Sequence, residues 1–112
     1  MKYINPSQKK WVKGHGYKKK VFLKYKNTQV QTNIFKPGSE VKSHFHKKTT
    51  EIFYILKGRA LLWIKKRRFK AKPGDVFLCQ AGEKHRVKNN SKIDFLIFVF
   101  RLSPSKKDTY YD

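Results

Sequence analysis

The sequence contains a single cysteine, Cys79, among its 112 residues. One thiol allows no disulfide within the chain, which excludes a small secreted scaffold held by disulfides and suits a reducing compartment. The N-terminal segment has no apolar core of the kind that a signal peptide needs, and no window approaches 18 uninterrupted apolar residues. We therefore expect a soluble, cytoplasmic protein with no membrane partner.

Acidic residues are scarce, with 7 Asp and Glu against 28 Lys and Arg, and the formal net charge is +21. Such an excess creates a positive field that attracts anionic metabolites, nucleic acid or anionic lipid without choosing among them. Ion-pair networks of the thermophilic kind would need Glu to rise together with Lys, which it does not. A drift of the whole proteome towards lysine explains the charge equally well, so its functional meaning stays open.

No segment shows the 3.6-residue periodicity of an amphipathic helix. From Val21 onward, apolar and polar residues alternate, and the bulky residues are largely β-branched or aromatic, which is typical of strands. Turn motifs such as "KPGS", "LKGR" and "KPGD" separate the alternating segments. The predicted strands are 20–26, 28–35, 41–46, 50–57, 59–65, 68–71, 75–79, 84–89 and 92–102. Many short strands at this spacing predict an all-β sandwich or barrel.

The length fits one domain, which we divide into an N-terminal arm at 1–18, a β-barrel domain at 19–103 and a C-terminal tail at 104–112. The last predicted strand, "IDFLIFVFRL", is apolar on both of its faces through its middle. One face therefore belongs to the core, and the other should be covered by the arm or by a second subunit. We expect a homodimer, with the arm around Trp11 and Tyr17 as one candidate for its seam.

Two of the four histidines lie with a glutamate in "SHFHKKTTEIFYILKG", residues 43 to 58. In a strand, His44 and His46 point to the same face, and a turn through "KKTT" would return the chain with Glu51 beside them. His85 opens another strand just after a glycine-containing turn. Three imidazoles and one carboxylate suit one divalent ion of Fe, Mn, Co, Ni, Cu or Zn. Four protein ligands would leave a six-coordinate ion two open positions for water or substrate.

These residues carry a family resemblance. The spacing of the first cluster resembles the first cupin motif, and the segment around His85 resembles the second. The matching positions are Gly38, His44, His46, Glu51 and Gly58, then Gly74, Gly82, His85 and Asn89. Gln80 stands where the second motif has proline, which we expect to soften the turn slightly. The resemblance covers about residues 36–92 and implies a single-domain cupin, a double-stranded β-helix or jelly-roll barrel, with His44, His46, Glu51 and His85 as the metal ligands.

The chemistry that this resemblance implies ranges over dioxygenases, sugar-phosphate isomerases, decarboxylases and plain metal or ligand binding. We predict a metal-binding cupin that binds or acts on a small anionic metabolite, and the sequence leaves open whether it is an enzyme. One alternative is a non-catalytic metal or ligand sensor. Another is a nucleic-acid-binding protein, which only the charge supports, because no RNP-type motif, zinc-finger spacing or recognition helix is visible.

Three other features receive separate interpretations. His15 stands alone in "KGHGY" and is predicted to lie outside the metal site. Cys79 is predicted to be a small buried apolar residue, and the alternatives are a place in the pocket or a role as a soft outer ligand. The run "KKRR" at 65–68 is predicted to form the solvated tip of a hairpin, with contact to an anion or to nucleic acid as the alternative.

Overall fold

Strands form where the sequence alternates between apolar and polar residues. The computed structural model describes residues 1–111, and nine of its strands lie within three residues of the predicted bounds. They are β2 (Lys18–Tyr25), β3 (Thr28–Phe35), β4 (Glu40–Phe45), β5 (Thr50–Lys57), β6 (Ala60–Ile64), β7 (Arg67–Ala71), β8 (Val76–Cys79), β9 (His85–Lys88) and β10 (Phe95–Leu102). The prediction of an all-β fold is confirmed.

Three short elements lie outside the predicted strands. The 3₁₀ turn η1 (Pro6–Gln8) is capped by the Asn5 side chain, β1 (Val12–Lys13) pairs with β2, and β11 (Tyr110–Tyr111) pairs with β4. Sequence periodicity cannot reveal two-residue strands, because one alternation is too short to stand out. Among the described residues, no helix has the length and apolar character that crossing a bilayer demands. The division into arm, barrel and tail stays a prediction.

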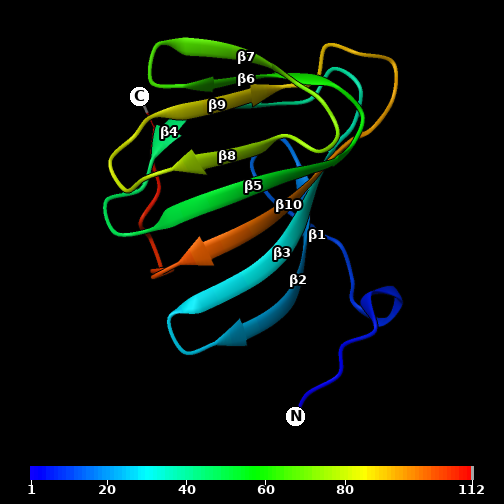
Figure 1. Ribbon diagram of the computed structural model, residues 1–112, viewed down its shortest axis with the longest axis vertical. Helices are drawn as coiled ribbons and strands as arrows, with labels where there is room; N and C mark the ends of the chain where they lie inside the picture. The colour runs from blue at the N-terminus through cyan, green and yellow to red at the C-terminus, as the bar shows by residue number, and fades with distance from the viewer. Residues whose placement is uncertain (112) are drawn as a thin grey trace.

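The strands form two facing sheets. The six-stranded sheet has the order β1-β2-β3-β10-β5-β8, and the five-stranded sheet has the order β11-β4-β9-β6-β7. In Figure 1 the five-stranded sheet lies above, and the chain after β10 crosses from the lower sheet to reach β4. The last residues of the described chain therefore join the two sheets at one end of the sandwich.

The interior of the sandwich is divided into an apolar end and a polar end. Along β10 the inward residues run from Phe95 through Ile97 and Val99 to Arg101. On β5, Ile55 lies beside Ile97, while Glu51 lies opposite Arg101. Burial of the apolar end supplies the driving force for folding, at roughly 25 cal/mol per Å² of apolar surface removed from water. The same two strands carry the polar side chains Glu51 and Arg101 at the other end.

The turn between β5 and β6 requires glycine. Gly58 has φ +82°, and a Cβ placed on it would lie 2.2 Å from the backbone oxygen of Asp94. A side chain here would meet both a strained backbone conformation and a collision with the segment that leads into β10. This motif glycine therefore fixes how the β5–β6 turn approaches the start of β10.

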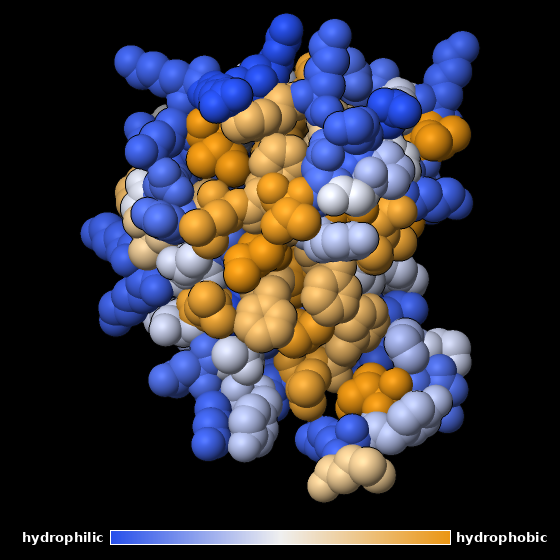
Figure 2. All heavy atoms as spheres, in the orientation of Figure 1, coloured by the Kyte–Doolittle hydropathy of each residue, from blue (hydrophilic) through white to orange (hydrophobic). Residues whose placement is uncertain are grey.

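The outer face of the six-stranded sheet is apolar and partly exposed. Tyr54 and Ile52 of β5 pair with Phe98 and Phe100 of β10. Tyr54 and Leu56 are 45% and 43% exposed. Figure 2 shows apolar side chains gathered in a band over β5, β10 and β3, bordered by hydrophilic side chains. In a chain of which 31% is charged, an uncharged face of this extent is typical of an interface.

We expect the outer face to mediate self-association. Tyr54→Glu should shift the protein towards the monomer, because the new charge would be desolvated between two apolar sheets. Sedimentation velocity measures this shift. Tyr110→Glu is the matched control, since Tyr110 is 37% exposed and lies on the other sheet.

Salt should strengthen this association. The two copies carry +21 each, and added salt screens their repulsion while leaving apolar burial intact. A wild-type protein that stays monomeric at high salt and high concentration would contradict the expectation, as would equal effects of the two variants.

Candidate metal centre

Both sheets supply residues to a buried polar cluster. His44 lies on β4, and His46 follows the end of that strand with its side chain on the same face. His85 opens β9, where it pairs with His44 on one side and Ile64 on the other. Glu51 lies on β5 in the facing sheet. All four side chains are buried. The prediction that the turn through "KKTT" returns the chain antiparallel beside the histidines is wrong, because β4 and β5 lie in different sheets. Glu51 instead faces the histidines across the sandwich.

The donor atoms converge. One ligand atom from each of His44, His46 and His85 lies within 4.8 Å of the others. Glu51 Oε1 lies 3.2 Å from His46 Nε2 and 3.2 Å from His85 Nε2. With bonds of about 2.1 Å, neighbouring ligands of one ion are about 3 Å apart. The spacing therefore fits a single shared metal ion, and the part of the chain that the structure describes holds no other His, Cys or carboxylate cluster of this kind.

The second nitrogen of each imidazole faces a backbone carbonyl. His44 Nδ1 lies 2.8 Å from Lys42 O, His46 Nδ1 lies 3.0 Å from Asp108 O, and His85 Nδ1 lies 3.1 Å from Glu83 O. A carbonyl oxygen can only accept, so each Nδ1 carries the hydrogen and donates it. In a neutral imidazole this leaves the Nε2 lone pair for a metal, the tautomer that metal-bound histidines commonly show.

Arg101 holds the outer oxygen of the Glu51 carboxylate. Its Nε donates to Glu51 Oε2 at 3.0 Å, while Oε1 faces the histidines. Burial alone would raise the pKa of Glu51, but hydrogen bonds from His46 and His85 and the charge of Arg101 outweigh burial and lower the pKa. The carboxylate is thus ionised at neutral pH and fixed in orientation. Sequence reasoning missed Arg101, because nothing near it along the chain marks it as a partner of Glu51.

The surroundings shift the pKa values of His44 and His46 in opposite directions. Burial, followed by the neighbouring charge of His85, lowers the pKa of His44 to about 4, so His44 is neutral at physiological pH. Burial also opposes the charged form of His46, but the hydrogen bond and charge of Glu51 outweigh it and raise the pKa of His46. A divalent cation would replace the proton on His46 as the partner of the Glu51 carboxylate.

The C-terminal segment anchors this cluster. The buried carboxylate of Asp108 accepts hydrogen bonds from the backbone N–H groups of Lys47, Lys48 and Thr49, which form the turn after His46. The backbone oxygen of Asp108 accepts from His46 Nδ1. Asp108 is therefore a positioning residue that sequence reasoning missed, because its partners lie about 60 residues away along the chain.

Hydrogen bonds hold the turn before His85. The backbone N–H of Gln80, which a proline would lack, donates to Glu83 Oε1 at 2.7 Å. The N–H of Gly82, at φ +88°, donates to His46 O at 2.6 Å and so ties this turn to the neighbouring ligand. These hydrogen bonds hold the turn in place of the ring of proline, and the softer turn expected at Gln80 stays a prediction.

Cys79 and His15 match their predicted places in part. Cys79 is buried, and burial together with the charges of Glu51 and Glu83 raises the pKa of its thiol to about 12, so it stays protonated. Its Sγ lies 3.1 Å from His85 Nδ1, behind the ligand and away from the Nε2 atom that faces the cluster. His15 lies outside the three-histidine cluster, yet it lines the same cavity and packs against Tyr111.

The cluster lies at the bottom of a cavity of about 300 Å³ with a cationic and amide-rich wall. Lys19 and Arg101 contribute positive charge, and Gln31 and Asn33 contribute amides from β3. Burial, followed by the charge of Arg101, lowers the pKa of Lys19. A water molecule occupies about 30 Å³, so the cavity has room for a molecule of roughly ten non-hydrogen atoms. The two cationic side chains give this wall a positive potential.

Comparison with known proteins gives the family. The family model described as "Cupin domain" matches residues 32–100, which is more than half of the chain. A curated relative, an uncharacterized protein of Methanocaldococcus jannaschii, is 32% identical over 73 residues. That match covers 64% of this chain and 58% of the relative, so the chain spans somewhat over half the length of this relative.

Solved structures agree with this fold. A structure described as a "predicted oxalate decarboxylase" from Thermotoga maritima has a TM-score of 0.84 at 20% identity, covering 92% of this chain and 100% of that one. The structure of KdgF from Halomonas sp. has a TM-score of 0.86 at 16% identity, covering 95% and 96% of the two chains. At such identities the likeness concerns the fold alone, and it confirms the predicted two-sheet barrel.

We expect Asp108→Ala to weaken both the fold and the metal centre. Three backbone donors would lose a charged acceptor, which should lower the free energy of unfolding by roughly 2–3 kcal/mol in urea titrations of the metal-free protein. Looser fixation of His46 should weaken metal binding by about tenfold in calorimetry. Asp108→Asn, which keeps an acceptor oxygen, should lose less on both measures. Equal metal affinity in the wild type and in Asp108→Ala would contradict the positioning role.

The effect of Asp108 should also depend on pH. Burial alone would raise its pKa, but hydrogen bonds from Lys48, Lys47 and Thr49 outweigh burial and lower it. A carboxylate with a depressed folded pKa contributes stability above its unfolded pKa of about 3.9 and loses that contribution as pH falls through the folded value. The stability gap between the wild type and Asp108→Ala should therefore be constant near neutrality and shrink below about pH 4. A gap that widens on acidification would contradict this sign.

Proposed function

The chain belongs to the cupin domain family, and from this premise we propose that it holds one divalent transition-metal ion and binds a small anionic molecule beside it. His44, His46, His85 and Glu51 would be the ligands. One observation carries the proposal: three Nδ1 atoms face backbone carbonyls, so the Nε2 atoms are left for the cluster, where those of His46 and His85 lie 3.2 Å from Glu51 Oε1. Nitrogen lone pairs and a carboxylate repel one another unless a proton or a cation lies between them. A divalent cation would bind all four donors at once.

The chemistry of the donor set restricts the ion. Imidazole nitrogen and carboxylate oxygen are ligands of borderline softness, which suit Fe, Mn, Co, Ni, Cu or Zn rather than Ca or Mg. Neither the ligand set nor the spacing chooses among these six metals. When bound, the ion would supply a Lewis acid that polarises an oxygen of the ligand.

The residues around the centre would select the ligand. Lys19 and Arg101 provide a positive field at the cavity wall, and Gln31 and Asn33 offer amide groups beside them. Gln31 Nε2 already donates to Asn33 Oδ1 at 2.8 Å, so the amides are held in a fixed row along β3. These groups favour a small carboxylate or a phosphorylated or hydroxylated acid over a neutral apolar molecule. Decarboxylase, isomerase and dioxygenase chemistry all use such substrates.

Metal binding is the first test. Protein stripped with a chelator and titrated with each ion in a calorimeter should bind one equivalent of at least one transition metal. His44→Ala should lose this binding, because the site would keep only three of its donors. His15→Ala is the matched control and should bind like the wild type, since His15 lines the cavity outside the cluster. Absence of stoichiometric binding for every ion, or equal behaviour of the two variants, would overturn the proposal.

Ligand binding and turnover separate an enzyme from a sensor. A panel of small carboxylates and sugar phosphates should raise the melting temperature of the metal-loaded protein more than that of the stripped protein. Turnover that appears only with metal would assign an enzyme, whereas stabilisation without turnover would assign a binding module. Nucleic-acid binding that weakens linearly with salt on logarithmic axes and persists in His44→Ala would instead support the charge-based alternative.

A further inference from the structure

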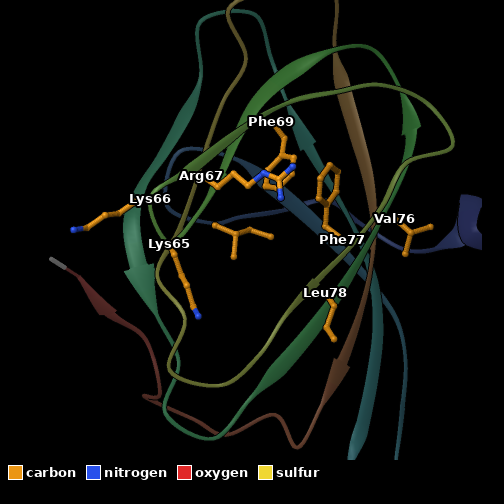
Figure 3. Close-up of a pocket in the computed structure, with 8 residues that line it drawn as sticks. Lys65, Lys66, Arg67, Phe69, Val76, Phe77 and Leu78 are labelled. Atoms are coloured by element: carbon orange, nitrogen blue, oxygen red, sulfur yellow. The ribbon is translucent and has the colours of Figure 1, made fainter.

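A second pocket lies apart from the histidine cluster. It lies between the β6–β7 hairpin and β8, which are edges of the two different sheets, and has a volume of about 790 Å³. None of the four proposed metal ligands lines it. Figure 3 shows the residues around it, with the labelled side chains of the hairpin on the left and those of β8 on the right. This volume lies within the range of small-molecule sites, about 300–1,000 Å³.

The inner wall of this pocket is aromatic and aliphatic. Phe69 and Phe77 meet edge to face with ring centroids 5.2 Å apart, and Ile64 completes the wall. All three pack against the main core, so they form a fixed surface rather than a mobile one. Val76 and Leu78 extend the apolar surface at the rim and are 60% and 51% exposed. Such a wall binds an apolar body of a few carbon atoms by removing its surface from water.

The mouth of the pocket is cationic. It carries Lys65, Lys66 and Arg67 and no acidic residue. Lys65 pairs with Glu83 at 3.2 Å, whereas no ion pair joins Lys66 or Arg67 to an acid within residues 1–111. The Arg67 guanidinium lies 4.8 Å from the centre of the Phe69 ring, and Figure 3 shows Arg67 reaching towards the two phenyl rings while Lys66 points away from them. Arg67 thus presents its donors at the edge of the apolar wall.

We propose that this pocket binds a compact amphipathic anion, an acyl or aromatic carboxylate whose head group pairs with Arg67 and whose apolar body lies on Phe69 and Phe77. Guanidinium donors match a carboxylate in geometry, and the rings supply the apolar contact. A second copy of the chain is disfavoured at this place, because it would bring another cationic hairpin against Lys65, Lys66 and Arg67. The site is independent of the metal centre and gives the "KKRR" segment its alternative role, contact with an anion.

Decanoate is the probe that tests this site. In two-dimensional amide NMR of the full chain, titration below the micellar concentration should shift resonances of β7, β8 and the hairpin between β6 and β7. For a ligand of this size we expect a dissociation constant of roughly 0.1–1 mM. Octyl glucoside, which has a similar apolar body and no charge, should bind at least tenfold more weakly. Sulfate, which has charge and no apolar body, should give no saturable shift.

Two arginine variants provide the matched comparison. Arg67→Gln should weaken decanoate binding about fivefold or more, because the head group loses its partner. Arg59→Gln removes one exposed charge from the β5–β6 turn and should leave the affinity within twofold of the wild type. His44→Ala should also bind decanoate normally, so this result is independent of any failure at the metal centre.

Several outcomes would overturn the proposal. Shifts that map to the histidine cavity or to the outer face of β5 and β10 would place the ligand elsewhere. Equal affinity for decanoate and octyl glucoside would show that the pocket binds the apolar chain without recognising the charge of the head group. If the protein sediments with vesicles of anionic phospholipid and shows no saturable decanoate binding, the cationic hairpin binds a lipid surface instead.

Discussion

The buried carboxylate of Glu51 is the interaction on which the polar half of the molecule depends. An ionised carboxylate inside a sandwich is expensive unless positive charge and hydrogen-bond donors compensate for lost water. Here Arg101 holds one oxygen at 3.0 Å, and His46 and His85 face the other at 3.2 Å. The strands that carry these residues come from both sheets. Closing the sandwich around the apolar end therefore also brings the charged groups into register at the polar end.

The C-terminal segment, which leads into β11 of the five-stranded sheet, completes this arrangement. Asp108 binds the turn after His46 through three backbone N–H groups and holds the His46 ring through its own carbonyl. The ring orientation that exposes Nε2 is thus set by residues that lie far away along the chain. The C-terminal segment also packs Tyr111 against His44 and His15, and all three residues line the cavity. Fold stability and the geometry of the centre are linked through this one segment.

The local sequence pattern predicts most strands of the fold. The residues that it does not predict make their contacts with partners far away along the chain. Alternation predicted nine strands, because each is long enough to show its period, and the His-x-His spacing predicted that His44 and His46 share a face. Arg101 and Asp108 carry no local signal, since their partners are about 50 and 60 residues away. The second pocket likewise arises where edges of two sheets meet. The four-ligand set, the homodimer and the cytoplasmic location stay predictions.

The central claim is that four donors from three segments of the chain bind one ion. A crystal of the metal-loaded protein, measured at the absorption edge of the ion that it binds, tests this claim most directly. We expect one anomalous peak at about 2.0–2.3 Å from the Nε2 atoms of His44, His46 and His85 and from a Glu51 oxygen, with Arg101 on the other oxygen. A peak at any other place, or an ion that leaves Glu51 outside bonding distance, would contradict it.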